Sequence, residues 1–281
     1  MDTVRVERRQ AQAGEIAEVV LDRPTAMNAL DTATLRALAE TFNRLRADPG
    51  VVAVVLSSAI ERAFCVGADL KERAGMSDAQ IMEQRPVFRA AFGALLALPQ
   101  PAIAAVHGFA LGGGCELALS CDVIVVDGTA ILGLPEASVG LVPGCGGTQL
   151  MARRIGPGRA AELIFTGRRV QAGEAASIGL VDVLVTEESA RARALDLAWE
   201  IAANSPVAVR AAKQALRNGS GLGLVAALDV EDAAWRTAAV SADRREGIAA
   251  FAEKRKPSWP SVAGLSRSAG GGAGSKETGG G

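Results

Sequence analysis

Two glutamates in apolar, glycine-rich surroundings are the strongest candidates for chemistry in this sequence. Glu116 is the only acid in the stretch ALGGGCELALSC, and Glu136 lies in the stretch LGLPEASVGLVPGCGG. Burial raises the pKa of a carboxyl group, and a second carboxylate nearby separates the two pKa values further. A pair with one protonated and one ionised carboxyl is suited to acid/base catalysis on a single substrate. Taken alone, Glu136 is also compatible with a salt bridge or with a charge at a helix N-terminus.

The glycines at 112–114 offer a second kind of chemistry. A glycine run followed by a helical segment can expose backbone N–H groups at a helix N-terminus. Such donors stabilise an anion or a developing oxyanion. The same glycines could instead serve only the close packing of a strand against a helix, and this stretch alone leaves both interpretations open. A phosphate-binding loop is disfavoured, because no Lys-Ser or Lys-Thr pair follows the glycines.

A second turn of this kind lies in the segment FCVGADLKER, residues 64–73. Its small residues Val66, Gly67 and Ala68 would let a ligand approach the backbone closely. Lys71 and Arg73 could bind a phosphate group. On its own, the segment is better explained as a surface turn with solvated charges.

Thiol and metal chemistry are not indicated. The four cysteines, Cys65, Cys115, Cys121 and Cys145, lack the spacing of metal ligands, and His107 is the only histidine. A cysteine nucleophile needs an activating base, so we expect packed thiols in a reducing compartment.

The composition excludes several classes of protein. The 281 residues are 49% hydrophobic and 22% charged, which fits one large soluble domain or two unequal ones. A net charge of −1 gives no overall basic field for nucleic acid or an anionic membrane. No apolar run is long enough to span a membrane, and the N-terminal MDTVRVERRQ is not followed by the apolar core of a signal peptide. We therefore expect a cytoplasmic protein.

The first two-thirds of the chain alternates strand-like and helical segments that would position these residues. Apolar, β-branched runs predict strands, and a 3.6-residue apolar period predicts helices. The predicted strands cover residues 16–22, 51–58, 102–108 and 122–128. Two predicted helices begin at Asp31 and at Asp78, and Pro99 and Pro101 end the second of them at about residue 98. A third predicted helix begins at the glycine run. This alternation predicts an α/β fold with parallel strand pairing and right-handed crossovers.

The last third is predicted to be mainly helical. Helical segments cover residues 160–167, 172–179, 189–204, 206–219, 222–239 and 242–256, with one strand at 181–185. The final VAGLSRSAGGGAGSKETGGG lacks core residues, so a disordered tail is expected over residues 259–281.

Five segments resemble the enoyl-CoA hydratase/isomerase, or crotonase, family. They are LDRPTAMNAL (21–30), FCVGADLKE (64–72), ALGGGCELALSCD (110–122), LGLPEASVGLVPGCGGTQ (132–149) and AAELIFTG (160–167). They occur in the family's order, and the resemblance covers roughly residues 3–258. Five segments in register are far more specific than any one of them.

The resemblance implies a fold and a class of substrate. The fold is an α/β spiral of ββα units over residues 1–200, followed by a helical region over residues 201–258 that builds trimers, often paired into hexamers. The substrate is an acyl-CoA thioester, and no metal or redox cofactor is required. The walls of the acyl pocket are expected to come in part from residues 77–92.

The resemblance also implies roles for individual residues. The backbone N–H groups of Ala68 and Gly113 would hold the thioester oxygen. Glu116 would orient and deprotonate the water that attacks Cβ, and Glu136 would supply the Cα proton. Gly144 matches a position whose N–H helps orient water or substrate. The remaining expected substrate contacts are Thr25, Ala26, Met27, Val66, Asp69, Leu70, Lys71 and Pro135.

The presence of both glutamates favours a hydratase of 2-enoyl-CoA thioesters within the family. The runs DLKERAGMS and EGIAAFAEKRKP resemble the methylglutaconyl-CoA hydratase branch, so that activity and an enoyl-CoA isomerase are the alternatives. A different class is a non-catalytic or RNA-binding crotonase-fold protein, since that branch is associated with RNA binding through a lysine-bearing helix. The matching helix here, TLRALAETFNRLRAD, mixes arginines with Glu40, so no nucleic-acid partner is expected.

Overall fold

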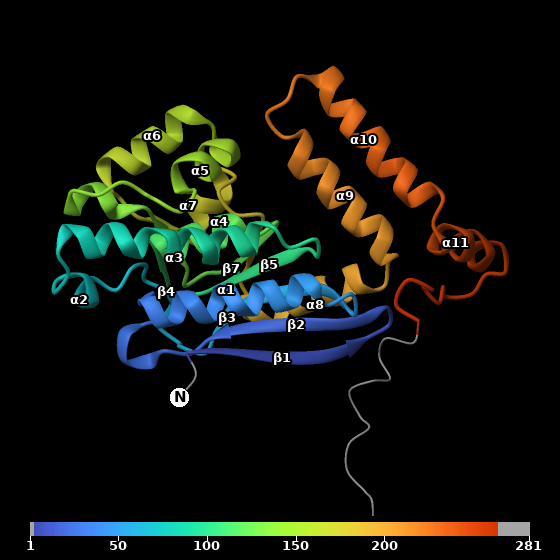
Figure 1. The fold of residues 1–281 in the computed structure, drawn as a ribbon, viewed down its shortest axis with the longest axis horizontal. Helices are drawn as coiled ribbons and strands as arrows, with labels where there is room; N and C mark the ends of the chain where they lie inside the picture. The colour runs from blue at the N-terminus through green and yellow to red at the C-terminus, as the bar shows by residue number, and fades with distance from the viewer. Residues whose placement is uncertain (1–2, 264–281) are drawn as a thin grey trace, which may run out of the picture.

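The computed structural model describes residues 3–263, and its main feature is a six-stranded sheet in the order β1-β2-β3-β5-β7-β10 (Figure 1). The strands are β1 (Val4–Ala11), β2 (Gly14–Leu21), β3 (Val51–Ser58), β5 (Ala102–Val106), β7 (Val123–Asp127) and β10 (Val183–Val185). From β2 onward all neighbours pair in parallel, as predicted, while β1 pairs antiparallel with β2.

The strand β1 is not predicted by the apolar runs, because only alternate residues at its start are apolar. Val4 and Val6 alternate there with Arg5 and Glu7. β1 lies at the edge of the sheet, and most of its residues are exposed or half-buried. A strand with polar and apolar residues in alternation is stable in such an edge position.

A second sheet of four short strands, in the order β4-β6-β8-β9, completes the α/β core. The strands are β4 (Ala63–Cys65), β6 (Phe109–Leu111), β8 (Ile131–Gly133) and β9 (Val170–Gln171). Along the chain, a strand of the small sheet follows each of three strands of the large sheet, β3, β5 and β7. Each successive turn of the chain therefore adds one strand to the large sheet and one to the small sheet. This repeat is the spiral of ββα units that the resemblance implies. Strands of two or three residues show no measurable apolar period, so they escape prediction.

Helices cover both faces of the large sheet (Figure 1). They are α1 (Thr32–Ala47) and α3 (Asp78–Leu96), which pack against each other, and α8 (Ala190–Ala202). Alternate side chains of β3 enter the two cores: Val54 and Leu56 face the cluster of α1 and α3, whereas Ala53 and Val55 face α8. Every residue of β3 is buried, as expected for an apolar strand covered on both faces.

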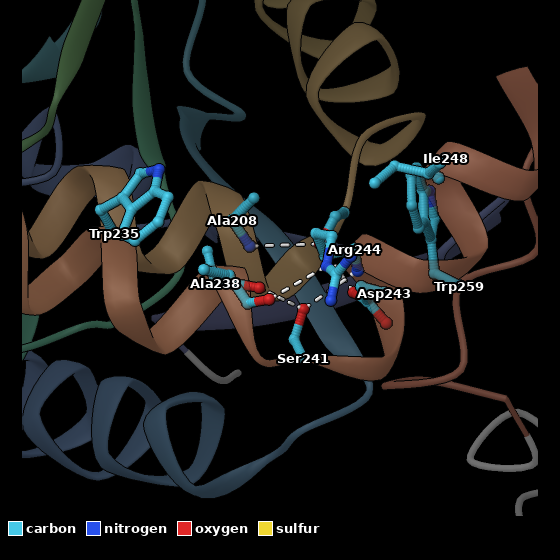
Figure 2. Close-up of a pocket in the computed structure, with 11 residues that line it drawn as sticks. Ala208, Trp235, Ala238, Ser241, Asp243, Arg244, Ile248 and Trp259 are labelled. Carbon is cyan, nitrogen blue, oxygen red and sulfur yellow. Dashed lines mark hydrogen bonds between the residues drawn. The ribbon is translucent and has the colours of Figure 1, made fainter.

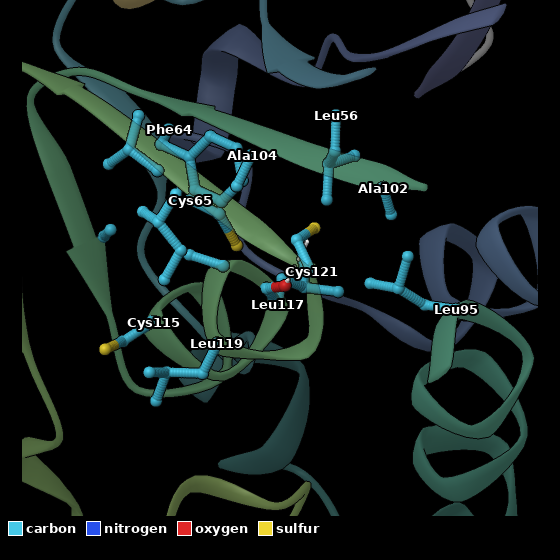
Figure 3. Packing of buried hydrophobic residues seen from close by; sticks show 14 of the residues in the cluster. Leu56, Phe64, Cys65, Leu95, Ala102, Ala104, Cys115, Leu117, Leu119 and Cys121 are labelled. Atoms are coloured by element: carbon cyan, nitrogen blue, oxygen red, sulfur yellow. Dashed lines mark hydrogen bonds between the residues drawn. The ribbon is translucent and has the colours of Figure 1, made fainter. Parts of the chain in front are cut away.

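The helix α4 (Gly113–Ser120) runs through the core, and all of its residues are buried. Figure 3 shows Leu117 of this helix among the surrounding aliphatic side chains. Cys65, Cys115 and Cys121 are free and buried in the same cluster, and burial raises the pKa of Cys65 and of Cys121 to about 12. Thiols with such pKa values stay protonated at neutral pH, in agreement with packed rather than catalytic cysteines.

The C-terminal helices stand apart from the sheets. In the body lie α5 (Gly147–Ile155), α6 (Pro157–Thr166) and the short α7 (Ala172–Ser177), which contacts the small sheet. After α8 follow α9 (Pro206–Gly219), α10 (Leu224–Ala239) and α11 (Ala242–Ala252). α9 and α10 form a pair that projects from the body, with α11 beyond them (Figure 1). Asp122 ties α9 to the core, because its carboxylate lies 2.7 Å from Nζ of Lys213 and 2.8 Å from Nη2 of Arg217. Within residues 3–263, none of the helices combines the length and hydropathy needed to cross a membrane.

A cavity of about 620 Å³ lies between α9, α10 and α11. Figure 2 shows Trp235 at one end of this cavity and Trp259 at the other. Asp243 is buried at its edge and accepts a hydrogen bond of 2.7 Å from the hydroxyl of Ser205. This bond joins the starts of α9 and α11.

The segment after α11 is packed against the body rather than disordered. Nε1 of Trp259 donates to the carbonyl oxygen of Ala203 at 3.0 Å, and the hydroxyl of Ser261 donates to Asp243 at 2.8 Å. Val262 is buried in the cluster beneath α8. The expectation of a disordered tail from residue 259 is therefore wrong for residues 259–263, where two apolar side chains find core contacts. The rest of that expectation, over 264–281, lies outside the described residues.

Candidate active site

Glu116 lies in the first turn of α4, where the glycine run joins β6 to the helix. Gly112 caps the helix with a φ of 52°, a left-handed value that favours glycine. Gly114 packs directly on the backbone of β4, since a Cβ there would lie 2.0 Å from the carbonyl oxygen of Cys65. This close packing brings Glu116 into the core, where it is only 2% exposed.

The turn before α5 binds the carboxylate of Glu116. The N–H groups of Cys145 and Gly147 donate to its Oε1 at 2.6 and 2.8 Å. Gly147 has no room for a side chain, because a Cβ would lie 2.9 Å from the same oxygen. Burial raises the pKa of Glu116 and outweighs the two backbone donors and the guanidinium of Arg85, which lower it. Both backbone donors bind Oε1, and neither binds Oε2.

Glu136 lies on the 3-10 helix η2 (Pro135–Val139) and lines the same cavity as Glu116. Its Oε1 lies 3.1 Å from the position that a Cβ on Gly112 would take. Its Oε2 is buried without a hydrogen-bond partner within residues 3–263. Burial, with a smaller contribution from the negative charge of Glu116, raises the pKa of Glu136 to about 7. A buried carboxyl group of this kind is suited to carry a proton and deliver it.

Ala68 and Gly113 bring two backbone N–H groups together. The segment after β4 pairs with Leu30, whose N–H donates to Gly67 at 2.7 Å and whose carbonyl accepts from Asp69 at 3.1 Å. These bonds do not use the N–H of Ala68. A Cβ built on Gly113 would lie 3.8 Å from the nitrogen of Ala68, so the two amides are neighbours. Neither N–H has a hydrogen-bond acceptor in the described part of the chain, and such a pair of donors suits a developing oxyanion.

A cavity of about 530 Å³ connects these groups. Eight of the expected site residues line it: Val66, Ala68, Leu70, Gly113, Glu116, Pro135, Glu136 and Gly144. The helix α3, from which a pocket wall is expected, contributes the apolar side chains of Ile81, Met82 and Phe88. The cavity is thus apolar on one side and carries the carboxyls and the free backbone donors on another.

The cavity is also lined by two arginines that no sequence pattern singles out, Arg85 and Arg169. The guanidinium of Arg169 lies 5.8 Å from the ring centroid of Phe109, and that of Arg85 donates to the carbonyl oxygen of Gly144. Neither arginine belongs to a motif or a distinctive spacing. Only the fold brings them to the site.

The expected coenzyme contacts Thr25, Ala26, Met27 and Lys71 do not line this cavity. Thr25 and Ala26 belong to the 3-10 helix η1 (Pro24–Ala26), and Lys71 is exposed on α2 (Leu70–Arg73). The chain after η1 lies beside the turn over residues 66–69, called here the oxyanion turn, since Leu30 forms a parallel bridge with Ala68. A role of these residues in coenzyme binding stays a prediction.

Asp69 holds the oxyanion turn in place rather than lining the cavity. Its Oδ1 accepts from the N–H groups of Lys71 and Glu72 at 2.9 and 3.2 Å, and its Oδ2 lies 2.7 Å from Nη1 of Arg23. Burial raises the pKa of Asp69, but the bond to Arg23 and the two backbone donors outweigh it, so the pKa is lowered. Its carboxylate is engaged in these bonds, and a contact of Asp69 with substrate stays a prediction.

Asn28 is a positioning residue that the sequence patterns do not reveal. Its Nδ2 donates to the hydroxyl of Ser58 at 2.8 Å and to the carbonyl of Phe64 at 2.9 Å, while its Oδ1 accepts from the N–H of Arg23 at 2.7 Å. These bonds connect the segment after β2 with β3 and β4, and β4 leads into the oxyanion turn. A single amide between apolar residues in TAMNAL is the signal that could have found it.

Known proteins are similar to this chain in sequence and in fold. Residues 11–262 match the family model described as enoyl-CoA hydratase/isomerase. The chain belongs to the enoyl-CoA hydratase/isomerase family. The short-chain-enoyl-CoA hydratase of Clostridium acetobutylicum is 39% identical over 243 residues, which cover 86% of this chain and 93% of that protein. The mitochondrial methylglutaconyl-CoA hydratase of Homo sapiens is 37% identical over 262 residues, which cover 92% of this chain and 77% of that protein.

A solved structure of the family agrees with the fold. The crystal structure of enoyl-CoA hydratase from Bacillus anthracis matches with a TM-score of 0.88 at 40% identity, covering 92% of this chain and 98% of that one. This confirms the α/β crotonase-type fold implied by the five sequence segments. The proteins of this family act on acyl-CoA thioesters.

Proposed function

We propose that this protein is an enoyl-CoA hydratase, which adds water across the Cα=Cβ bond of 2-enoyl-CoA thioesters. The observation that carries this proposal is the pairing of two different carboxyls beside two unused backbone donors. Glu116 is a carboxylate bound by two N–H groups, and Glu136 is a buried carboxyl with one oxygen unpartnered within residues 3–263. One base and one acid are what the addition of water requires.

The reaction begins with the thioester carbonyl oxygen between the N–H groups of Ala68 and Gly113. The two donors stabilise the negative charge that develops on this oxygen as the double bond reacts. Oε2 of Glu116 takes a proton from a water molecule while the water oxygen forms a bond to Cβ. Glu136 then donates its proton to Cα, which restores the thioester carbonyl.

The atoms of this sequence balance without another reactant. Water supplies the hydroxyl on Cβ and a proton to Glu116, and Glu136 supplies the proton on Cα. A final proton transfer from Glu116 to Glu136 through solvent restores the starting state. The proposal therefore requires no metal or redox cofactor.

The test is hydration of crotonyl-CoA, followed by loss of the absorbance of the conjugated thioester. Glu116→Gln and Glu136→Gln each lower kcat by about 10²–10⁴-fold, the range of a lost general acid or base, without loss of the folded state by circular dichroism. Glu83→Gln is the matched control, because Glu83 is exposed on α3 and has no ion pair among the described residues. Hydration near the wild-type rate by either site variant would refute these roles.

The same hydration assay tests which acyl group the protein prefers in its substrate. Crotonyl-CoA, longer 2-enoyl-CoA thioesters and methylglutaconyl-CoA are compared by kcat/KM, the last because the human relative acts on it by name. A 3-enoyl-CoA substrate tests the alternative, an isomerase, which moves one proton and needs no water. Conversion of 3-enoyl-CoA faster than hydration would favour the isomerase.

Self-association through the C-terminal helices, as a homotrimer or a dimer of trimers, belongs to this proposal. The helix α10 leaves the large apolar side chains of Leu224, Val225, Leu228 and Trp235 exposed in the single chain. Apolar patches of this kind mark contacts between proteins. We propose no nucleic-acid partner, since the chain carries a net charge of −1 and Arg44 on α1 lies 3.9 Å from Glu40.

A further inference from the structure

One peptide group in the active site is bound by opposite charges at its two ends. It joins Gly144 to Cys145 and is called here the 144–145 peptide. Its carbonyl oxygen accepts a hydrogen bond from Nη2 of Arg85, and its N–H donates to Oε1 of Glu116 at 2.6 Å. The arginine and the glutamate therefore polarise the same peptide dipole in the same direction, and each bond strengthens the other.

Arg85 is directed at this peptide and not at an acidic side chain. Within residues 3–263, no carboxylate forms an ion pair with Arg85, although the chain has many such pairs. Its Nη1 lies 3.8 Å from Sγ of Cys145 and 3.0 Å from the position that a Cβ on Gly144 would take. The guanidinium thus packs against the turn that carries both donors to Glu116.

Arg85 is also the cation that acts most directly on Glu116. Its charge lowers the pKa of Glu116 against the effect of burial. The other titratable groups around this carboxyl supply no positive charge. Glu136 on η2 is a carboxyl group, and burial raises the pKa of the Cys145 thiol to about 12. Arg73 on α2 acts on that thiol, and Arg154 on α5 acts on the buried thiol of Cys115.

The position of Arg85 on α3 explains how it reaches the turn. Ile81 and Phe88, which line the cavity, are four residues before it and three residues after it on the same helix. Residues at these spacings share one helix face. The helix therefore presents an apolar wall and the guanidinium to the cavity together.

We propose that Arg85 is a positioning residue of the reaction, which acts through the 144–145 peptide to hold Glu116 oriented and ionised. The role rests on the proposed hydratase function, in which Glu116 takes the proton from water. Arg85 makes no contact with the reacting atoms in this role. Without it, the turn loses its anchor on α3, and the carboxylate loses the positive charge of that guanidinium.

The test compares Arg85→Gln and Arg85→Lys with the control Arg89→Gln. Arg89 is exposed one turn further along α3 and has no ion pair among the described residues. We expect Arg85→Gln to lower kcat for crotonyl-CoA by about tenfold, the effect of one hydrogen bond to a charged group, with little change in KM. The acid limb of the kcat profile moves to higher pH, because the base is protonated over a wider range. Arg85→Lys keeps the charge but lacks the planar donor, so its kcat is expected to lie between those of Arg85→Gln and the wild type. The kcat of Arg89→Gln is expected to match that of the wild type.

A second measurement does not depend on turnover. The carboxyl carbon of Glu116 is titrated by NMR in protein labelled at glutamate, and its signal is assigned by its loss in Glu116→Gln. We expect the pKa of Glu116 to be higher in Arg85→Gln than in the wild type. An unchanged pKa overturns the proposal, and so does a variant that raises KM alone, since Arg85 would then bind substrate. If the pKa rises but the wild type hydrates no enoyl-CoA, the proposed function fails and the positioning of Glu116 stands.

Discussion

A single methyl group at Gly114 tests whether the packing of α4 on β4 sets the oxyanion hole. In Gly114→Ala, the new Cβ would lie 2.0 Å from the carbonyl oxygen of Cys65 and 2.6 Å from its carbonyl carbon. Both atoms belong to backbone, so no side-chain rotation relieves the overlap. Ordinary contact begins at 3.4 Å, so the helix and the strand must separate by roughly 1.4 Å.

The cost of this separation follows from the rigidity of the core. Insertion of a methyl group into a packed core costs about 1–3 kcal/mol, and a backbone neighbour places this site at the upper end. The higher helix propensity of alanine offsets up to about 1 kcal/mol. We therefore expect a net loss of about 2 kcal/mol, or a Tm lower by about 5 °C.

The effect on catalysis is expected to be larger than the effect on stability. Cys65 ends β4, three residues before Ala68, and Gly113 precedes Gly114. Separation of the two elements therefore moves the two N–H donors apart. A donor displaced by about 1 Å lowers kcat by about 100-fold.

Two assays on one pair of variants check this reasoning. Thermal unfolding by circular dichroism gives the Tm, and hydration of crotonyl-CoA gives kcat. Gly93→Ala is the control, because Gly93 is exposed on α3 and a Cβ there has no atom within 4 Å. It is expected to stabilise the protein by about 0.5–1 kcal/mol with kcat unchanged. A Gly114→Ala variant with the wild-type Tm and kcat would show that the close approach does not set the site.

The other predictions concern pH and the turn that holds the oxyanion hole. Above pH about 7, kcat/KM for hydration falls because Glu136, with its pKa raised to about 7, loses the proton that it must donate. It falls again at acid pH as Glu116 is protonated, and a profile that stays flat on the alkaline side contradicts the role of Glu136. Asn28→Ala leaves the N–H of Arg23 and the carbonyl of Phe64 without their partner, so urea unfolding should show a loss of about 3 kcal/mol. A loss below about 1 kcal/mol would mean that water or another group replaces the amide.

The large elements follow from local patterns because each pattern extends over several residues. The apolar run VVAVVLSS predicts β3, and the structure buries all of it between two layers of helices. The small sheet escapes this approach, since β4, β6 and β8 have three residues each. Their pairing depends on strands brought together from distant parts of the chain, and no local period encodes that.

The candidate site divides in the same way. The apolar surroundings of Glu116 and Glu136 are visible in the sequence and point to carboxyls with raised pKa values. The donors that bind Glu116 are not visible, because they are backbone groups of Cys145 and Gly147, some thirty residues away. Arg85 cannot be told from other exposed arginines by its neighbours in the chain. The sequence therefore indicates the candidate reacting groups, and the fold shows which groups contact them.

The glycines at 112–114 show why two interpretations of one motif need not compete. Gly112 takes the left-handed conformation that turns the strand into the helix, with a φ of 52°. Gly113 supplies an N–H beside Ala68, and Gly114 allows the backbone contact with Cys65. Exposed donors and close packing are thus both present, at different residues of the run. The packing at Gly114 sets how far α4 lies from β4, and that distance sets the separation of the two donors. An alanine at 114 is therefore expected to lower catalysis without changing any group proposed to bind or react.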